Sequence, residues 1–376
     1  MSTVIRFRSW ACKVPLDHPI RFRWNTITHR DCTVVELTTD DGLTGAAIGL
    51  SRGAPIDVVA FDMLAPLVVG AEAFDVAGFQ ESARAAHSFL DQTGMLAQAR
   101  SLVDLALWDI RGKALGAPLW RLLGGRWRKA PVLLVEGYEL PDESDEQFAR
   151  RLAARAEEGF TAIKLEAAGY EDPAQLENRL RLTRRLAGEG LALIVDVNGA
   201  WRSVREAATV IRRIQDVGLA WVEDPFPHDR IAETGELRGL VDAPLGAGDD
   251  VTDPLVLADL ANTRAVDVMR VDATTLGGIQ ATADAVAAAR LHGLPVSGHA
   301  HAATHQHLSY AWPEAHYVEA FPDDRPFEPS YKLTTSSVYA RVQDGHLAPP
   351  EEPGLSFELA LDRVDAWSVR RAEAIA

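Results

Sequence analysis

The sequence has few cysteines and no long uninterrupted apolar segment. Its two cysteines, Cys12 and Cys32, are too few for a disulfide framework, so we expect two buried thiols in a reducing compartment. The longest apolar stretch, residues 58–70, is interrupted by Asp62 and is too short to span a bilayer. The first ten residues lack the apolar centre of a signal peptide. These absences predict a soluble cytoplasmic protein with no membrane partner.

An excess of basic residues is also missing. The chain has 38 Lys and Arg against 54 Asp and Glu, a formal net charge of −16, which argues against binding to nucleic acid or anionic membranes. An acidic small molecule is not excluded as a ligand, because a bound cation can make the electrostatic potential at the site positive. The 376 residues, 47% hydrophobic and 24% charged, are ordinary for a globular protein and sufficient for two domains.

The pattern of apolar residues changes along the chain. Residues 1–50 resemble strands with an Asp-Gly hairpin turn, and residues 55–125 have helical spacing, which together indicate an α+β domain. From Arg126 onward, short apolar runs alternate with helical segments, as in a TIM-type α/β barrel. The eight expected strands are 132–135, 162–165, 192–195, 220–222, 245–247, 266–269, 295–297 and 317–318. We therefore predict domains at 1–125 and 126–331, with 332–376 returning to the first domain.

Three of the expected strands end in a carboxylate. Asp196, Glu223 and Asp249 follow apolar runs and are each separated by about one strand–helix unit. The carboxyl ends of neighbouring parallel strands lie side by side, so these three groups would face and repel one another. A hard divalent cation relieves that repulsion, and oxygen ligands favour magnesium, calcium or manganese over zinc.

Other polar residues fall at the same end of the expected barrel. Lys164 and Glu166 are two residues apart on one strand, so their side chains point the same way. Asp272, His299 and Glu319 follow the last three strands. A carboxylate beside an imidazole fixes its tautomer and raises its basicity. The arrangement suits removal of a proton α to a carboxylate, with His299 as base and a metal and Lys164 stabilising the enediolate.

Each of these residues also has a simpler explanation. A single acid at a strand end is often a helix N-cap or an ion-pair partner, Lys164 could be a structural ion-pair residue, and Asn198 could serve a turn instead of the site. Several residues in register around one rim are harder to explain in that way. The remaining histidines are expected in the core or on the surface: His301, His305, His307 and His316. Surface or packing roles compete with substrate contact for Arg21, Arg23, Arg52 and Tyr138.

These motifs together resemble the enolase superfamily, in particular its mandelate racemase-like branch. The helix Asp104–Gly125 (DLALWDIRGKALGAPLWRLLGG) looks like the signature at the end of the family's capping domain. The segments VDVNGAW, WVEDPF, AGDD, VDATTLGGI and VSGHAH follow in the family's order. The resemblance covers nearly the whole chain.

The resemblance implies a modified (β/α)7β barrel with an N-terminal α+β capping domain completed by the C-terminal segment. It also implies one magnesium ion per subunit, a base formed by Asp272 and His299, and Glu319 close to the substrate carboxylate or its enediolate. Capping loops around 14–28 and 49–54 would close over a small-molecule carboxylate. Relatives of this type often form homo-oligomers, either dimers or octamers. The family's ligand set maps onto Asp196, Glu223 and Asp249.

Two positions differ from the family pattern. Asp249 stands where this branch usually has Glu, and Lys164-Leu165-Glu166 replaces the Lys-x-Lys of the racemases. With one clear base, the leading hypothesis is a dehydratase that converts an acid sugar, an aldonate or aldarate, to a 2-keto-3-deoxy acid. In that reaction Lys164, Glu166, Asn198 and Glu319 would contact the substrate.

Three other hypotheses remain. The first is a racemase, epimerase or lactone cycloisomerase that uses the same enediolate, in which Glu166 would act on the second face of the substrate. The second is a non-catalytic family member. The third is a zinc hydrolase, suggested only by His299-Ala300-His301. It is disfavoured because such enzymes carry His-x-His on the first barrel strand, and none occurs near residues 132–138.

Overall fold

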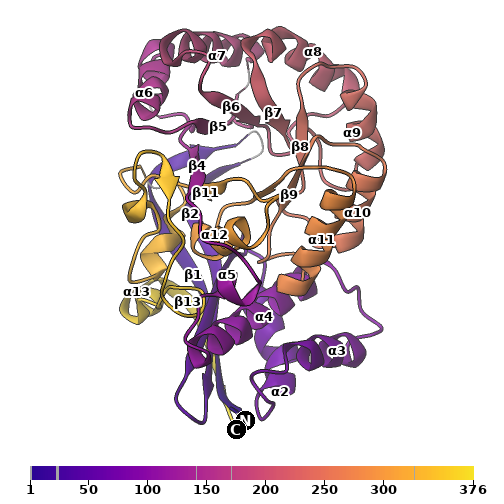
Figure 1. Cartoon of the computed structure of the whole chain (residues 1–376), viewed down its shortest axis with the longest axis vertical. Helices are drawn as coiled ribbons and strands as arrows, with labels where there is room; N and C mark the ends of the chain where they lie inside the picture. Colours follow the sequence, from indigo (N-terminus) through magenta and orange to yellow (C-terminus); the bar gives the residue numbers. More distant parts are fainter. Residues whose placement is uncertain (1, 23–24, 141, 171, 326) are drawn as a thin grey trace.

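The computed structural model describes residues 2–22, 25–140, 142–170, 172–325 and 327–376. Its N-terminal part contains a four-stranded antiparallel sheet with the order β13-β1-β2-β3. The strands are β1 (Val4–Arg21), β2 (Thr26–Thr39), β3 (Thr44–Leu50) and β13 (Ser368–Ile375). The last strand of the chain pairs with the first, and the two termini lie together (Figure 1). The expected return of the C-terminal segment to the capping domain is therefore confirmed.

The expectation of loop structure at 14–28 is wrong for most of that segment, while its closure over a substrate stays a prediction. β1 continues to Arg21 and β2 begins at Thr26, and their pairing runs from Val4↔Thr39 to Arg21↔Thr26 with a shift between Pro15 and Ile20. The backbone is therefore an extended hairpin, stabilised by cross-strand hydrogen bonds along most of its length. The second expected loop does exist, since β3 ends at Leu50 and Arg52 adopts a left-handed φ of 49°. Arg23 lies outside the described residues.

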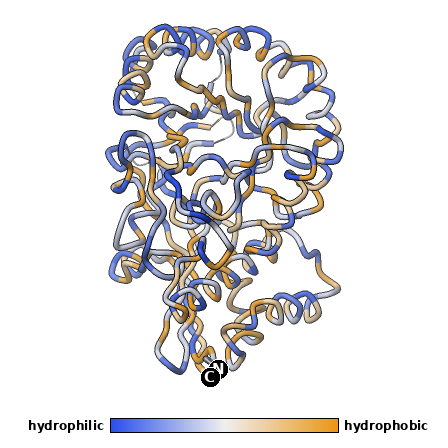
Figure 2. Tube along the Cα trace, viewed as in Figure 1, coloured by the Kyte–Doolittle hydropathy of each residue, from blue (hydrophilic) through white to orange (hydrophobic). Residues whose placement is uncertain are grey.

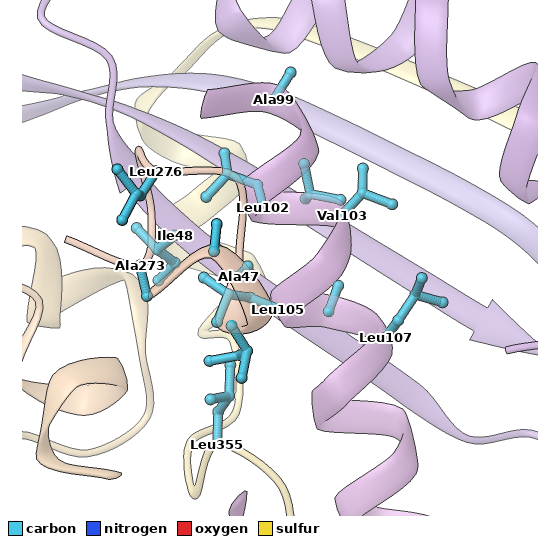
Figure 3. Packing of buried hydrophobic residues seen from close by; sticks show 14 of the residues in the cluster. Ala47, Ile48, Ala99, Leu102, Val103, Leu105, Leu107, Ala273, Leu276 and Leu355 are labelled. Carbon is cyan, nitrogen blue, oxygen red and sulfur yellow. The ribbon is translucent and has the colours of Figure 1, made fainter. Parts of the chain in front are cut away.

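Six helical segments follow the sheet and join it to the barrel. Helix α4 packs its apolar face on β3 and also meets the barrel loop that carries Ala273 and Leu276 (Figure 3). The approach to β3 is so close that a Cβ at Gly45 would lie 2.1 Å from the carbonyl oxygen of Ala106. The segments are α1 (Ile56–Val59), the π-helix η1 (Ala60–Leu64), α2 (Ala65–Val68), α3 (Val76–Ala86), α4 (Gly94–Ala114) and α5 (Leu119–Leu122).

The family-like helix signature has a structural role at this junction. Asp109 on α4 is fully buried and accepts hydrogen bonds from the backbone N–H groups of Ala46 at 3.0 Å and Leu355 at 2.7 Å. Lys113, one turn later, pairs with the same carboxylate at 3.0 Å. Burial raises the pKa of Asp109 to about 6. One carboxylate thus ties the capping sheet, α4 and the C-terminal segment together.

The rest of the fold is a nearly closed barrel of eight parallel strands. They are β4 (Ala130–Val135), β5 (Ala162–Glu166), β6 (Ala192–Asp196), β7 (Leu219–Glu223), β8 (Leu245–Ala247), β9 (Val268–Val271), β10 (Val296–Gly298) and β11 (Val318–Ala320). From β4 to β10 each strand pairs with the next one in sequence, and β11 pairs with β4, so that among the described residues the two ends of the sheet are β10 and β11. The short β12 (His346–Leu347) adds an antiparallel edge to β4. The predicted barrel is confirmed, with strand limits displaced by one or two residues at several ends.

Helices surround the barrel strands (Figure 1), and polar and apolar residues alternate along them (Figure 2). Side chains at the N-termini of several helices cap backbone N–H groups, including Ser144, Asp172, Ser203 and Asp253. The α-helices are α6 (Asp145–Glu157), α7 (Pro173–Ala187), α8 (Val204–Ile214), α9 (Ile231–Arg238), α10 (Pro254–Asn262), α11 (Ile279–Leu291), α12 (Ala302–Ala311) and α13 (Leu361–Trp367). Short 3-10 segments are η2 (Gln215–Val217), η3 (Pro329–Leu333) and η4 (Tyr339–Arg341).

Two expectations from composition can be compared with the fold. Cys12 and Cys32 are buried free thiols that face each other across β1 and β2, as predicted. Within the part of the chain that the structure describes, we find no helix with the length and apolar character needed to cross a membrane. The domain limits at 125 and 331 stay a prediction.

Candidate active site

The carboxyl ends of the barrel strands gather the predicted polar residues beside one cavity. The register places Glu166 of β5 beside Asp196 of β6, and Asp196 beside Glu223 of β7. Residues predicted from the sequence that line the cavity are Lys164, Glu166, Asp196, Asn198, His299 and Glu319, together with Arg52 and Tyr138. Three other predicted residues, Glu223, Asp249 and Asp272, contact members of this set directly.

Asp196, Glu223 and Asp249 form a compact buried triad. Each offers one carboxylate oxygen, and these oxygens lie within 4.8 Å of one another. The three residues are at most 5% exposed, so water screens the repulsion between their carboxylates poorly. Hard oxygen ligands in this number suit magnesium, which commonly completes its coordination with substrate or water. The donor set therefore fits the predicted metal.

Lys164 occupies the centre of this triad. Its Nζ lies 2.5 Å from Glu223 Oε1, 3.2 Å from Asp196 Oδ2 and 3.8 Å from Asp249 Oδ2. Burial lowers the pKa of Lys164, but the surrounding carboxylates outweigh it and hold the pKa well above its ordinary value. Lys164 is therefore cationic, whether its role is structural or catalytic.

The three carboxylates of the triad titrate differently. Burial raises the pKa of Asp196 to about 7 and that of Glu223 to about 8. Burial also acts on Asp249, but the adjacent Arg270, His299 and Lys164 outweigh it and lower the pKa of that carboxyl. Around neutral pH the metal-free triad consequently retains protons that a cation must displace.

Magnesium binding to metal-free protein is expected to release protons and to strengthen as pH rises from roughly 6 to 8. The raised pKa values of Asp196 and Glu223 mean that the fraction of fully ionised triad increases over this window. Isothermal titration calorimetry with Mg²⁺ in two buffers of different ionisation enthalpy measures the proton release directly. Equal binding enthalpies in both buffers, with affinity independent of pH, would contradict these raised pKa values.

His299 and Asp272 form the predicted pair. Nδ1 of His299 lies 3.0 Å from Asp272 Oδ2, and the other oxygen of Asp272 accepts bonds from the backbone N–H and hydroxyl of Thr274, both at 2.7 Å. Burial raises the pKa of Asp272, but His305 and His299 outweigh it and hold the pKa well below its usual value. An ionised Asp272 accepts the Nδ1 proton, which leaves Nε2 as the proton-accepting atom.

The side of His299 that bears Nε2 faces the metal triad. Nε2 lies 3.7 Å from Asp249 Oδ2. Burial lowers the pKa of His299, but the Asp249 charge and the hydrogen bond to Asp272 raise it to about 10. The pKa of this imidazole therefore depends on how far the charge of Asp249 is compensated by other cations.

Glu319 and Glu166 differ in their partners. Glu319 Oε1 accepts a bond from the Ala300 N–H at 2.9 Å, and its Oε2 lies 3.0 Å from Lys164 Nζ. Glu166 Oε1 accepts the Ala168 N–H at 2.8 Å, the Glu166 carboxyl also hydrogen-bonds to the Asn198 side chain, and burial raises the pKa of Glu166 to about 7. Glu166 can therefore exist in either protonation state near neutral pH.

Asn198 combines the two roles expected for it. Its φ of 47° places it in a left-handed turn, and its backbone N–H donates to Asp196 Oδ1 at 3.0 Å. The residue also lines the cavity. Its backbone supports a metal-triad carboxylate, and its side chain hydrogen-bonds to Glu166 beside the cavity.

The remaining histidines lie in the core or at the surface, as expected. His305 Nε2 lies 3.0 Å from the Ala273 backbone nitrogen and 3.3 Å from Asp272 Oδ1, and its Nδ1 lies 3.1 Å from the Ala300 carbonyl oxygen, so it supports the loop after β9. His301 Nε2 accepts the Leu50 N–H at 3.3 Å and is not directed to the same point as His299. His307 is buried, whereas His316 is exposed.

Sequence reasoning missed two arginines at the site. Arg270 is fully buried and contacts Asp249 at 2.7 Å and Glu223 at 3.2 Å. Arg30 of the capping sheet lines the cavity, donates to the Tyr138 hydroxyl at 3.2 Å and pairs with Glu328 at 3.1 Å. The signal for Arg270 was available, since a charged residue within an apolar barrel strand requires buried partners.

Comparisons with known proteins agree with this fold and site. Residues 5–124 match the Mandelate racemase / muconate lactonizing enzyme, N-terminal domain, and residues 147–363 match the family described as Enolase C-terminal domain-like. Muconate cycloisomerase 1 from Rhodococcus opacus is 25% identical over 97% of this chain and 98% of that protein. L-talarate/galactarate dehydratase from Salmonella typhimurium is 27% identical over 92% of this chain and 84% of that protein.

Solved structures show the same likeness. The crystal structure of L-talarate dehydratase from Polaromonas sp., complexed with Mg and L-glucarate, has a TM-score of 0.88 and 26% identity over 100% of both chains. A barrel with three carboxylates at its strand ends beneath an α+β cap defines an enzyme of the enolase type. The chain belongs to the mandelate racemase/muconate lactonizing enzyme family of the enolase superfamily. Its buried triad matches the magnesium site of that family.

Proposed function

We propose that the enzyme dehydrates an acid sugar, an aldonate or aldarate, to a 2-keto-3-deoxy acid. The observation that carries this proposal is the position of His299, whose Nε2 faces the metal triad while Asp272 holds its Nδ1. The opposite partner on β5 is Glu166 in place of the second lysine of a Lys-x-Lys pair. Dehydratases also occur among the relatives, including an arabinonate dehydratase that is 25% identical over 88% of this chain.

The reaction begins with proton transfer from the α-carbon. Asp196, Glu223 and Asp249 would hold magnesium, which supplies positive charge that stabilises the developing negative charge on the substrate carboxylate. Neutral His299 accepts the α-proton at Nε2 as the C–H bond breaks, and cationic Lys164 stabilises the resulting enediolate. The neutral form of His299 is favoured once the Asp249 charge is compensated, because that charge is the largest contribution raising its pKa.

The second half of the reaction removes water. The protonated His299 donates its proton to the β-hydroxyl as the C–O bond breaks, and the electron pair of the enediolate forms the new C=C bond. The enol product then tautomerises to the 2-keto-3-deoxy acid. Glu319, held by the Ala300 N–H and Lys164, would lie beside the substrate carboxylate.

The cavity lining suits a hydroxylated anion. Arg52 lines it from the side of the capping domain, and Tyr138, Glu166 and Asn198 line it from the barrel. These groups provide both hydrogen-bond donors and acceptors for hydroxyl groups along a sugar chain. Arg21, also considered from the sequence, is exposed and does not line this cavity. We keep a homo-oligomeric assembly, a dimer or octamer, and a cytoplasmic location as expectations.

A panel of hexonates, pentonates and hexarates tests this proposal. Purified protein with Mg²⁺ is incubated with each acid sugar, and 2-keto acids are detected as their semicarbazones. We expect product from at least one compound and none after the metal is removed with EDTA. Absence of any 2-keto acid across a stereochemically complete panel, from protein that binds Mg²⁺, would reject dehydration.

Isomerisation is the second candidate, and Glu166 is the observation that favours it. Its buried carboxyl lines the same cavity as His299 and has a pKa of about 7, so it could exchange a proton on the other face of an enediolate. The muconate cycloisomerase among the relatives shows that the family includes isomerases. A racemase or epimerase of this type needs both groups.

Replacement of Glu166 by Gln separates the two candidates. For a dehydratase driven by His299, we expect the rate of α-proton exchange to fall by less than roughly tenfold, because the removed group does not take the α-proton. For a two-base epimerase, inversion would be lost while exchange from one face survives. Stereochemical analysis of recovered substrate by NMR in deuterated water distinguishes these results, and Glu157→Gln on the exposed face of α6 is the matched control.

A further inference from the structure

The most unusual charged group near the site is Arg270 on β9. Its side chain is 0% exposed, although it lies between Met269 and Val271 in an otherwise apolar strand. Residues two apart on a strand share a face, so Arg270 points to the same side as Asp272 and lies one layer deeper in the barrel. Burial of a guanidinium is costly unless several carboxylates pair with it.

Every group bonded to Arg270 belongs to the site or to a neighbouring strand. Its Nε lies 2.7 Å from Asp249 Oδ1 and 3.2 Å from Glu223 Oε2. One terminal nitrogen donates to the Ser297 hydroxyl at 2.5 Å, and the other pairs closely with Glu319 Oε2. A single planar cation thus links two members of the triad to the carboxylate expected to contact substrate.

The contacts select particular carboxylate oxygens. Arg270 takes Oδ1 of Asp249 and, together with the Trp221 ring N–H, Oε2 of Glu223. The oxygens it leaves, Asp249 Oδ2 and Glu223 Oε1, are the ones that face Lys164 at 3.8 and 2.5 Å. Each acid is therefore oriented to present one defined oxygen to the centre of the triad.

The backbone around Asp249 depends on the same strand. Gly248, immediately before Asp249, has a φ of 132°, and a Cβ there would lie 2.3 Å from the carbonyl oxygen of Arg270. Asp249 is also one methylene shorter than a glutamate, so its reach into the site is limited. The Arg270 backbone limits the position of the backbone at Asp249, and the Arg270 guanidinium orients the Asp249 carboxylate.

We propose that Arg270 is a positioning residue of the metal site, which turns Asp249 and Glu223 so that each presents a single oxygen to the cation. Arginine suits this task because its planar fork donates to several carboxylates at once, whereas a lysine ammonium does not share that geometry. Groups that orient metal ligands in this way typically contribute 10- to 100-fold in metal affinity.

A purely electrostatic role makes the opposite prediction. If Arg270 acted only as a positive charge near the site, its removal would strengthen the binding of a divalent cation, because repulsion between the two cations would be lost. If it positions ligands, its removal weakens binding despite the lost repulsion. The direction of the change therefore distinguishes the two roles without reference to any substrate or reaction.

The experiment compares Arg270→Met and Arg270→Lys with wild type. Metal-free proteins are titrated with Mg²⁺ by calorimetry and with Mn²⁺ by electron paramagnetic resonance, whose line shape reports ligand geometry. We expect the Kd for Mg²⁺ to rise on the order of 10- to 100-fold in both variants, with an altered Mn²⁺ spectrum. Arg179→Met, which removes a buried arginine paired with Glu139 and Asp145, is the matched control and should retain the wild-type Kd.

Unchanged or tighter Mg²⁺ binding by folded Arg270→Met would overturn the proposal. If that variant does not fold, Arg270→Lys decides, because it retains the charge: wild-type affinity and spectrum in Arg270→Lys would also overturn it. Circular dichroism and thermal unfolding of the metal-free proteins establish folding for each variant. Both measurements stand apart from the proposed dehydration, so failure of either proposal is recognised separately.

Discussion

Replacement of His299 by asparagine is expected to lower the rate of α-proton exchange by on the order of 10²- to 10⁴-fold. Asparagine keeps a polar side chain of similar reach but removes the basic Nε2 that faces the metal triad. Asp272 remains anchored by the two bonds from Thr274, so the surrounding loop should be preserved. The measurement is the exchange rate in deuterated water with the substrate found in the acid-sugar panel.

The control for this variant is its metal affinity. His299 is not a member of the triad, so His299→Asn should bind Mg²⁺ with a Kd within a few-fold of wild type. The same substitution at His316, an exposed histidine, should leave exchange unaltered. An exchange rate near wild type in folded, metal-loaded His299→Asn would show that another group takes the α-proton.

Replacement of Glu223 by Gln is expected to abolish both metal binding and turnover. Glu223 is fully buried, its Oε2 is held by the Trp221 ring N–H at 2.7 Å, and its Oε1 faces the centre of the triad. The change preserves shape but removes the anionic ligand, and we expect turnover to fall by about 10³-fold, which corresponds to about 4 kcal/mol of transition-state stabilisation. Calorimetry with Mg²⁺ and the exchange assay measure the two losses.

The control for Glu223→Gln is the same substitution at a glutamate outside the triad. Glu236→Gln removes an exposed carboxylate on α9 and should leave both quantities unchanged. If Glu223→Gln bound Mg²⁺ as tightly as wild type, the assignment of the triad as the metal site would be wrong. Because excess Mg²⁺ would hide a loss of affinity, both assays are run at matched free Mg²⁺ concentrations.

Much of this site was predictable because the local sequence marks where each strand ends. Short apolar runs that stop at a polar residue identified β5, β6 and β7, and the parallel topology then placed Glu166, Asp196 and Glu223 side by side. The strand β9 was less well located, because the apolar Ala265 and Val266 precede it although the paired strand begins at Val268. Local pattern fixes a strand's existence better than its limits.

The parts that escaped prediction depend on contacts distant in sequence. Arg30 is held at the site by a hydrogen bond to the carbonyl oxygen of Phe327, 297 residues away. A pattern along the sequence does not reveal such a partner. The outer part of the β1–β2 hairpin was mistaken for a loop because Pro15, Asp17 and Pro19 interrupt the strand pattern. The cross-strand register that holds it is not visible along the chain. Arg270 was overlooked for a different reason. Its partners are the predicted metal ligands, and a metal ion alone was enough to explain how their charges are neutralised.

The central claim is that His299, beside the carboxylate triad, removes an α-proton and that water is then lost. Proton NMR of wild-type enzyme with Mg²⁺ and a panel of hexonates and hexarates in deuterated water tests it most directly. The account predicts loss of the α-proton signal together with the appearance of a 2-keto-3-deoxy product. Deuterium at the α-carbon of a product that keeps its β-hydroxyl would contradict dehydration and identify the enzyme as an isomerase.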